Sequence, residues 1–185
     1  MTVEEYLAEV ERLLPGAADI VRPYIEDESS LARLGTPAEV VARMKAQHRH
    51  LDAVTLPDGT TVVAVSFSSA YERDAPPDFG LYLDERWDPP WPHAHVDWPD
   101  FGLPADPDAF VAALEDLRVR SRRGEVVELG CLGAHGRTGT ALACLAVLAG
   151  VDGDPVDWVR STYCDKAVET DEQAAFARQT RRSPR

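Results

Sequence analysis

Three residues in the second half of the chain could carry out nucleophilic chemistry assisted by a proton donor. Cys131 is followed at the sixth position by Arg137, and Asp100 precedes the cysteine by the length of about one helix and one strand. A thiolate is a nucleophile, a guanidinium binds two oxygens of an oxyanion, and a carboxylic acid can protonate a leaving group. Together they predict transfer of an oxyanionic group, such as a phosphoryl group, through the cysteine.

The segment Cys131-Leu132-Gly133-Ala134-His135-Gly136-Arg137, here called the Cys131 loop, links a β-rich run at 125–129 to an apolar helical pattern that begins at Thr138. A cysteine that faces a helix N-terminus meets unpaired N–H groups and the positive end of the helix dipole, which favour the thiolate. The glycines let N–H groups converge on one point, where they bind a tetrahedral oxyanion. Thr138 would place its hydroxyl near the sulfur.

The segment Asp97-Trp98-Pro99-Asp100-Phe101-Gly102-Leu103-Pro104, here called the Asp100 loop, has the composition of a mobile lid. Its prolines restrict the backbone, Gly102 supplies a hinge, and Trp98 is a large aromatic anchor. Positioned acid catalysis contributes roughly 10²–10⁴-fold when the leaving oxyanion is poor. Asp97 is a second carboxylate nearby, which we interpret as a solvated or structural residue.

Both loops resemble motifs of the protein tyrosine phosphatase superfamily. Cys-x5-Arg followed by Thr138-Gly139 is similar to its signature loop, and Trp98-Pro99-Asp100 is similar to the acid loop of its tyrosine-specific members. The resemblance implies Cys131 as nucleophile, Arg137 as ligand of the phosphate and of the transition state, and Thr138 as the loop hydroxyl. It implies Asp100 as general acid and then base, Trp98 as hinge anchor, and residues 132–137 as the phosphate-binding loop.

The resemblance spans Trp98 to about Gln173 and contains two departures. The family usually has His immediately before the nucleophile, where this chain has Gly130, and Gly three residues after it, where this chain has Ala134. The first departure bears on the reactivity of Cys131, and the second requires Ala134 to adopt the loop's backbone angles. The short chain is more similar to compact bacterial-type or dual-specificity members than to full tyrosine-specific domains.

The segment Glu169-Thr170-Asp171-Glu172-Gln173 resembles the glutamine loop of tyrosine phosphatases. Gln173 stands at the second glutamine of that pattern and Glu169 at the first, so the resemblance implies that these two side chains position the hydrolytic water. The same residues also fit a helix that is capped by Thr170 and has an acidic first turn. The two interpretations are compatible.

We therefore expect a phosphomonoester hydrolase that acts through a phosphocysteine, with phosphotyrosine in protein as the favoured substrate. Phosphoinositides are disfavoured because the Cys131 loop lacks lysine. The main alternative is a pseudophosphatase that binds phosphorylated ligands without turnover, which Gly130 and Glu169 keep open. A thiol-dependent arsenate reductase or sulfur transferase would need a second working cysteine. The remaining alternative for the Cys131 loop is an ordinary strand–helix turn with a small buried cysteine and no catalytic role.

The composition and the net charge of the chain limit the kinds of molecule that it is expected to bind. The chain has 185 residues and a net charge of −13 from 32 acidic and 19 basic residues, so nucleic acid and anionic membranes are not expected partners. No targeting or membrane-spanning segment is visible, and three cysteines without framework spacing favour a reducing, cytoplasmic setting. We expect no cofactor, because Arg137 and the helix dipole can replace a metal ion. The oligomeric state is open.

Other polar and aromatic residues carry weaker signals. His93 and His95 lack a third ligand at suitable spacing, so no metal site is predicted, and His48 and His50 are interpreted as surface residues. Cys144 is expected in the core, and Cys164 either there or as a resolving thiol for Cys131. His135 is assigned to the rim of the phosphate loop. Trp87 and Trp91 could line the cleft or pack against the sheet.

The pattern of elements predicts an α/β fold with three layers: a central, mostly parallel sheet flanked by helices. The expected elements are helices at 3–14, from Thr36-Pro37, from 106–108 to Gly124, at 138–149, from Asp154-Pro155 and at 170–181. They also include a hairpin of 51–56 and 61–67, short strands at 80–83 and 125–129, and irregular segments at 71–78 and 88–95. We expect one phosphatase-like domain over 1–185, with an N-terminal helical segment at 1–48 and the catalytic motifs at 98–173.

Overall fold

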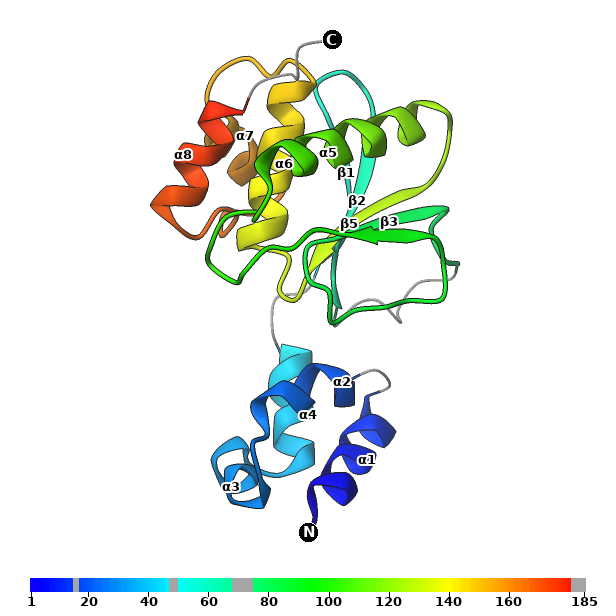
Figure 1. Ribbon diagram of the computed structural model, residues 1–185, viewed down its shortest axis with the longest axis vertical. Helices are drawn as coiled ribbons and strands as arrows, with labels where there is room; N and C mark the ends of the chain where they lie inside the picture. Colours follow the sequence, from blue (N-terminus) through cyan, green and yellow to red (C-terminus); the bar gives the residue numbers. More distant parts are fainter. Residues whose placement is uncertain (15–16, 47–49, 68–74, 181–185) are drawn as a thin grey trace. The chain divides into compact units, whose positions relative to one another are not determined.

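The computed structural model describes residues 1–14, 17–46, 50–67 and 75–180 (Figure 1). Residues 71–74 of the irregular segment predicted at 71–78, the position of His48 and the end of the last predicted helix at Arg181 lie outside the described residues. The chain divides into two compact units, Met1–His48 and Arg49–Arg185. The boundary between them falls at the predicted end of the N-terminal helical segment.

The first unit is helical. Its elements are α1 (Val3–Leu13), α2 (Ala17–Val21), the 3-10 turns η1 (Arg22–Tyr24) and η2 (Glu28–Ser30), α3 (Leu31–Leu34) and α4 (Pro37–Ala46). Reciprocal capping boxes begin α1, between Thr2 and Glu5, and α4, between Thr36 and Glu39. The apolar face of α1 packs against α4 around a small core that includes Val10, so the predicted amphipathic helix is confirmed.

The second unit carries the predicted motifs. Its strands are β1 (Leu51–Thr55), β2 (Thr61–Ser66), β3 (Phe79–Tyr82), β4 (His93–His95) and β5 (Val127–Cys131), and its helices are α5 (Pro107–Arg122), α6 (Gly136–Leu148), α7 (Pro155–Thr162) and α8 (Asp171–Gln179). The strands form one sheet in the order β1-β2-β5-β3-β4. Among the strands of the described segments, only β1 and β2, the predicted hairpin, pair antiparallel. The predicted three-layer α/β class with a mostly parallel central sheet is confirmed.

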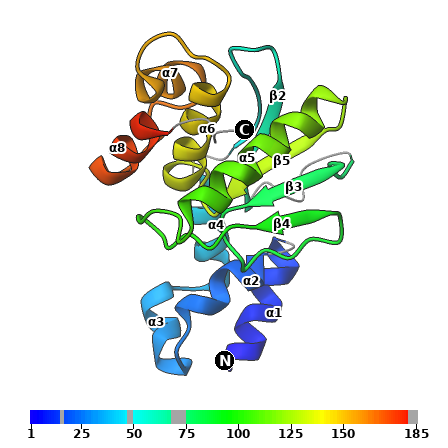
Figure 2. The same cartoon turned by 45° about the horizontal axis from the view of Figure 1, so that its top comes forward.

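Strand β4 was not predicted. The segment before His95 is rich in Pro and Trp, and it lacks the alternation of apolar and polar residues that marks a strand. The segment forms a strand because it pairs parallel to β3 at the edge of the sheet (Figure 2). In this pairing Gly80 lies opposite His93. The Pro92 carbonyl accepts the first of these backbone hydrogen bonds, from the Gly80 N–H at 3.0 Å.

Strand β5 is buried along its whole length between β2 and β3. Because successive side chains of a strand point to opposite faces, Leu129 and Cys131 share one face while Glu128 points to the other. Leu129 and Cys131 belong to the main core, together with the buried helix α6. Glu128 accepts a hydrogen bond from the Tyr82 hydroxyl at 3.0 Å on the opposite face. This alternation directs Cys131 toward α6.

The aromatic residues before the Asp100 loop pack on the face of the sheet that carries Glu128. The Tyr82 and Trp87 rings lie 4.2 Å apart between centroids, and the Trp91 indole N–H donates to the Tyr82 hydroxyl at 2.6 Å. Trp87 and Trp91 therefore pack against the sheet, the second of the two predicted alternatives. Among the helices of the described segments, none is long and apolar enough to cross a bilayer.

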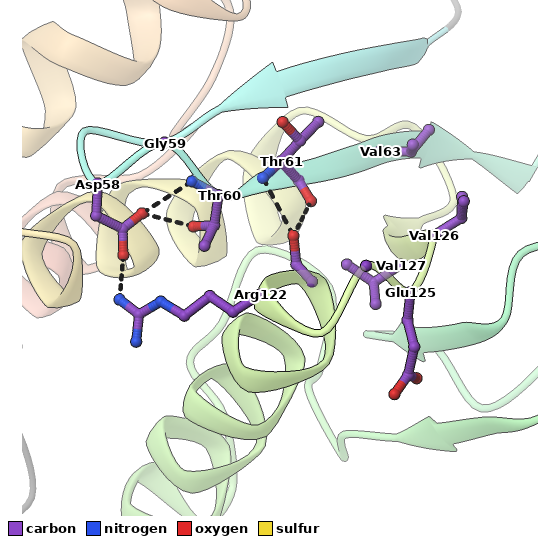
Figure 3. A pocket seen from close by; sticks show the side chains of 11 residues that line it. Asp58, Gly59, Thr60, Thr61, Val63, Arg122, Glu125, Val126 and Val127 are labelled. Atoms are coloured by element: carbon purple, nitrogen blue, oxygen red, sulfur yellow. Dashed lines mark hydrogen bonds and ion pairs between the residues drawn. The ribbon is translucent and has the colours of Figure 1, made fainter.

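The turn between β1 and β2 is tied to the C-terminal end of α5 by ion pairs, as Figure 3 shows for Asp58 and Arg122. Asp58 also accepts from the buried Arg118 at 2.6 Å and from the Thr60 hydroxyl at 2.6 Å. Burial alone would raise the pKa of the Asp58 carboxyl. The hydrogen bonds from these three residues outweigh burial and lower that pKa well below its usual range.

We predict that Asp58→Asn lowers the free energy of unfolding by about 2 kcal/mol at pH 7, because it removes one of the two carboxylates, Asp58 and Glu115, that balance the charge of the buried Arg118. A carboxyl with a depressed folded-state pKa stabilises the fold above its unfolded-state pKa and loses that effect as pH falls through the folded-state value. The difference between the two proteins should therefore be constant above pH 5 and shrink below about pH 4. Urea unfolding at several pH values measures it, and a difference that grows toward acid pH would contradict the prediction.

Candidate active site

Cys131 ends β5 and lies beneath the start of α6. Its side chain is buried, and the Thr138 hydroxyl donates a hydrogen bond to its sulfur at 3.1 Å. Thr138 lies in the first turn of α6, so the same short connection that delivers the helix N-terminus also delivers this hydroxyl. The sulfur thus has a hydrogen-bond donor that can stabilise negative charge on it.

One residue of the Cys131 loop, Ala134, has a left-handed backbone conformation. Ala134, where the resembling family has glycine, has a φ of +59° and is fully buried. This conformation costs a non-glycine residue about 1 kcal/mol. The Tyr163 hydroxyl donates to the Ala134 carbonyl at 2.7 Å, and burial raises the pKa of Tyr163, so the phenol stays a protonated donor. This hydrogen bond anchors the loop in the strained conformation.

The far end of the Cys131 loop becomes the N-terminus of α6. His135 is the N-cap residue, and its side chain makes no capping hydrogen bond to the helix amides. Its carbonyl accepts from the Gly139 N–H at 2.9 Å and the Val168 N–H at 3.2 Å. A side chain at Gly139 would collide with Ala167, so glycine allows this close approach. The uncapped helix N-terminus is suited to bind an anion.

Arg137 is buried and held in place from two sides. One terminal nitrogen, Nη1, donates to the carbonyls of Leu83 at 2.9 Å and Trp98 at 3.1 Å. The other, Nη2, pairs with Asp84 at 3.1 Å and lies 3.4 Å from the Asp100 carboxylate. The Nε–H is buried and has no hydrogen-bond partner among the residues that the structure describes. A buried N–H without an acceptor lowers the stability of the fold, so an acceptor such as a phosphoryl oxygen would stabilise Arg137.

Asp84 is a site residue that the sequence analysis missed. It follows β3, it is 6% exposed, and it binds the Arg86 guanidinium, with Nε at 2.7 Å, as well as Arg137. Burial alone would raise the pKa of Asp84, but the hydrogen bonds from Arg86 and the charge of Arg137 lower it below the usual value. Asp84 therefore stays ionised as the counter-charge of Arg137. No motif in the sequence marks it.

The Asp100 loop is anchored by its tryptophan. The Trp98 ring is buried against Phe110 of α5, with centroids 4.9 Å apart, and its indole N–H donates to the Gly102 carbonyl at 2.8 Å. Phe101, next to the acid, has a φ of +59° and is exposed. The Asp100 side chain is 52% exposed beside Arg137, which is the position of a group that could meet a leaving oxygen.

Gln173 of α8 links the Glu169 backbone to the Asp100 loop. Its amide oxygen accepts from the Glu169 N–H at 3.0 Å, and its amide nitrogen donates to the Gly102 carbonyl at 3.2 Å. Gln173 is fully buried, and its own N–H is capped by Thr170, so the predicted helix cap is confirmed. The predicted role of Gln173 in positioning water stays a prediction.

Glu169 lies directly against the Cys131 loop. A side chain placed on Gly136 would lie 2.1 Å from the Glu169 carboxylate, so the absence of a side chain allows this contact. Burial and the nearby charge of Asp100 raise the pKa of Glu169, and Arg137 and the Gly136 N–H only partly offset them. Glu169 thus lies where its ionised form would repel an anion placed at the N-terminus of α6.

The absence of histidine before Cys131 has a steric cause. Gly130 pairs with Val65 of β2, and a Cβ at this position would lie 2.5 Å from the Val65 carbonyl oxygen. No larger residue fits unless β2 moves. The sheet therefore requires glycine here, and the hydrogen bond to the Cys131 sulfur comes from Thr138.

The histidines outside the Cys131 loop lie in different surroundings. His50, predicted at the surface, is 2% exposed, so that prediction was wrong. It is buried because it packs on the Tyr163 ring, with centroids 4.5 Å apart, and it bonds to Asp52 and His135. His93 and His95 bind carbonyls of the preceding loop instead. Cys144 is in the core as predicted, where burial raises its pKa to about 12.

A pocket lies away from these groups. It is lined by the β1–β2 turn, the end of α5 and the first residues of β5, including Asp58, Arg122 and Val127 (Figure 3). Val127 begins β5 and Cys131 ends it, so the pocket lies at the opposite end of that strand from the candidate nucleophile. Its Asp58 and Arg122 pair with each other, and its Glu125 pairs with Arg120 of α5.

No known family model matches this chain. Two uncharacterised proteins of Methanocaldococcus jannaschii are similar to it. MJECL20 is 37% identical over 106 residues, which cover 52% of this chain and 71% of that protein. MJ0215 is 36% identical over 106 residues, which cover 52% of this chain and 65% of that protein, slightly less than two thirds.

Solved structures agree on the fold. The active form of Tk-PTP superposes with a TM-score of 0.55 at 23% identity and covers 66% of this chain and 92% of its own. The kinase associated phosphatase KAP, with its catalytic-site cysteine replaced by serine, gives 0.56 at 12% identity and covers 71% and 92%. The chain therefore has the protein tyrosine phosphatase fold that its motifs predict, and it belongs to one family with MJECL20.

Proposed function

We propose that this protein hydrolyses phosphomonoesters through a phosphocysteine formed on Cys131. The observation that carries the proposal is the buried Nε–H of Arg137, which has no hydrogen-bond partner within the described part of the chain. Arg137 is the last residue of the Cys131 loop, and its guanidinium lies beside Asp100. A phosphoryl group bound by the loop supplies the acceptor that this donor lacks. Tk-PTP and KAP, by their names, are phosphatases, which supports the same class of reaction.

The proposed reaction has two steps. In the first, the Cys131 thiolate attacks phosphorus, the bond to the ester oxygen breaks, and Asp100 gives that oxygen its proton. In the second, Asp100 takes a proton from water, the oxygen attacks phosphorus, and the sulfur leaves as a thiolate. The Thr138 hydroxyl, 3.1 Å from the sulfur, stabilises that thiolate. Arg137 and the N-terminus of α6 balance the charge on the phosphoryl oxygens in both steps.

Protein phosphotyrosine is the proposed substrate class. The Asp100 loop matches the acid loop of tyrosine-specific phosphatases nearly residue for residue, and residues 132–136 contain no lysine that would favour a phosphoinositide. The net charge of −13 repels anionic substrates at long range, so binding must come from contacts within the site. The expected location is cytoplasmic, because a catalytic thiolate needs reducing conditions.

We predict that Cys131→Ser abolishes turnover of para-nitrophenyl phosphate and retains binding of a phosphotyrosine peptide. The reason is that the serine hydroxyl is a much weaker nucleophile, while Arg137 and the loop remain. Steady-state kinetics and calorimetric titration measure the two effects. Cys144→Ser is the matched control and should keep full turnover. If the unaltered protein binds the peptide but never releases phosphate, it is a binding module rather than an enzyme.

We predict that Asp100→Asn lowers kcat for a phosphotyrosine peptide by roughly 10²–10⁴-fold and does not raise KM. The amide cannot protonate the tyrosyl oxygen, and it removes a negative charge 3.4 Å from Arg137. Asp97→Asn, three residues away and exposed, is the matched control and should change kcat little. An equal loss of kcat in the Asp97 variant would contradict the assignment of the acid.

We predict that Glu169→Gln lowers KM about fivefold at neutral pH, from an interaction on the order of 1 kcal/mol. The pKa of Glu169 is raised, so its carboxyl is neutral below that elevated value and charged above it. KM of the unaltered protein should therefore rise relative to that of the variant as pH increases through this range. Measuring both proteins with one substrate cancels the ionisation of the substrate. A KM ratio that is independent of pH would contradict this electrostatic role.

A further inference from the structure

A second cluster of side chains lies beside the Cys131 loop and is not used by the proposed reaction. His50, His135 and Cys164 each offer one ligand atom, and the three atoms lie within 4.8 Å of one another. The residues come from the segment before β1, from the Cys131 loop and from the turn after α7. His50 is 2% and Cys164 5% exposed, so the cluster is largely shielded from solvent.

The two histidines have the spacing of ligands to one metal ion. Nε2 of His50 and Nε2 of His135 lie 3.3 Å apart. Zinc binds imidazole nitrogen at about 2.0–2.1 Å with tetrahedral angles, which places two such nitrogens about 3.3 Å apart. A metal ion between the rings would replace the hydrogen bond that joins them in the metal-free protein. The thiolate of Cys164 completes a set of two nitrogens and one sulfur.

The Asp52 carboxylate orients the His50 ring for metal binding. Oδ2 of Asp52 lies 2.6 Å from Nδ1 of His50, which keeps the proton on Nδ1 and directs the lone pair of Nε2 toward His135. The Tyr163 ring, 4.5 Å from the His50 ring between centroids, holds that imidazole in place. A carboxylate–histidine pair of this kind is the usual support of a metal-binding imidazole.

We propose that His50, His135 and Cys164 bind one divalent transition-metal ion of the zinc type. Two imidazoles and a thiolate select zinc-like ions over magnesium or calcium, which prefer oxygen ligands. On binding, the Cys164 thiol releases its proton to solvent, His135 carries its proton on Nδ1, and water takes the fourth position. The site does not depend on Cys131 being a nucleophile. It would join the Cys131 loop, through His135, to two other segments of the second unit.

Cobalt(II) is the probe for this site, because a thiolate ligand gives it a charge-transfer absorption band. The experiment uses the full chain with Cys131→Ser, stripped of metal and kept reduced, so that the candidate nucleophile cannot be the ligand. We expect one cobalt per chain, a thiolate charge-transfer band, and displacement by one equivalent of zinc. Asp52→Asn, which removes the carboxylate that orients His50, should weaken binding by about 10- to 100-fold.

Cysteine variants show which sulfur binds the cobalt ion. The chain has three cysteines, so in the Cys131→Ser background only Cys144 and Cys164 remain. Adding Cys164→Ser should remove the charge-transfer band. Adding Cys144→Ser is the matched control and should retain it, because Cys144 is fully buried and accepts a hydrogen bond from Thr180. Circular dichroism checks that each variant is folded, and Cys164→Ala replaces Cys164→Ser if the latter is not.

Three outcomes would overturn the proposal. The first is the absence of a thiolate band in the folded Cys131→Ser protein, whether or not the unaltered protein shows one. The second is a band that survives Cys164→Ser or Cys164→Ala. The third is cobalt affinity that is unchanged by both His50→Ala and Asp52→Asn.

Discussion

The site depends on the burial of one guanidinium. Arg137 is 4% exposed, and a buried charge is costly unless counter-charges and hydrogen bonds surround it. Asp84 supplies the counter-charge, and the carbonyls of Leu83 and Trp98 accept from Nη1. Satisfying this one side chain therefore brings together the end of β3, the Asp100 loop and the start of α6. The remaining Nε–H is left for a ligand.

Close approach of backbone segments gives the site its shape. Three glycines allow these contacts because they have no side chain. Gly130 lets β5 lie close to β2, Gly136 lets the Glu169 carboxylate approach, and Gly139 lets α6 pack on Ala167. Ala134 departs from this pattern of small, unstrained positions, because it adopts a left-handed conformation that the Tyr163 hydrogen bond stabilises. The two departures from the family motif thus have different physical meanings. Gly130 is a steric requirement of the sheet, whereas Ala134 has a strained backbone conformation that the Tyr163 hydrogen bond offsets.

The electrostatics of the site are local and mixed in sign. The whole chain has a net charge of −13, yet Arg137 and the N-terminus of α6 face the position proposed for the phosphoryl group. Asp84, Asp100 and Glu169 lie around the same guanidinium or loop, with opposite pKa shifts at Asp84 and Glu169. Asp84 is stabilised as an anion by its arginines, whereas Glu169 is destabilised as an anion by burial and by Asp100.

The sequence by itself determined the α/β class, the β1–β2 hairpin and the candidate residues Cys131, Arg137 and Asp100, because local periodicity and short motifs encode them. It could not reveal Asp84 or the burial of His50, and it missed β4. Each of these depends on contacts between residues distant in the chain: Asp84 with Arg137, His50 with His135, and β4 with β3. Only the tertiary structure brings those partners together, since pairing at a sheet edge and around a buried charge leaves no local pattern.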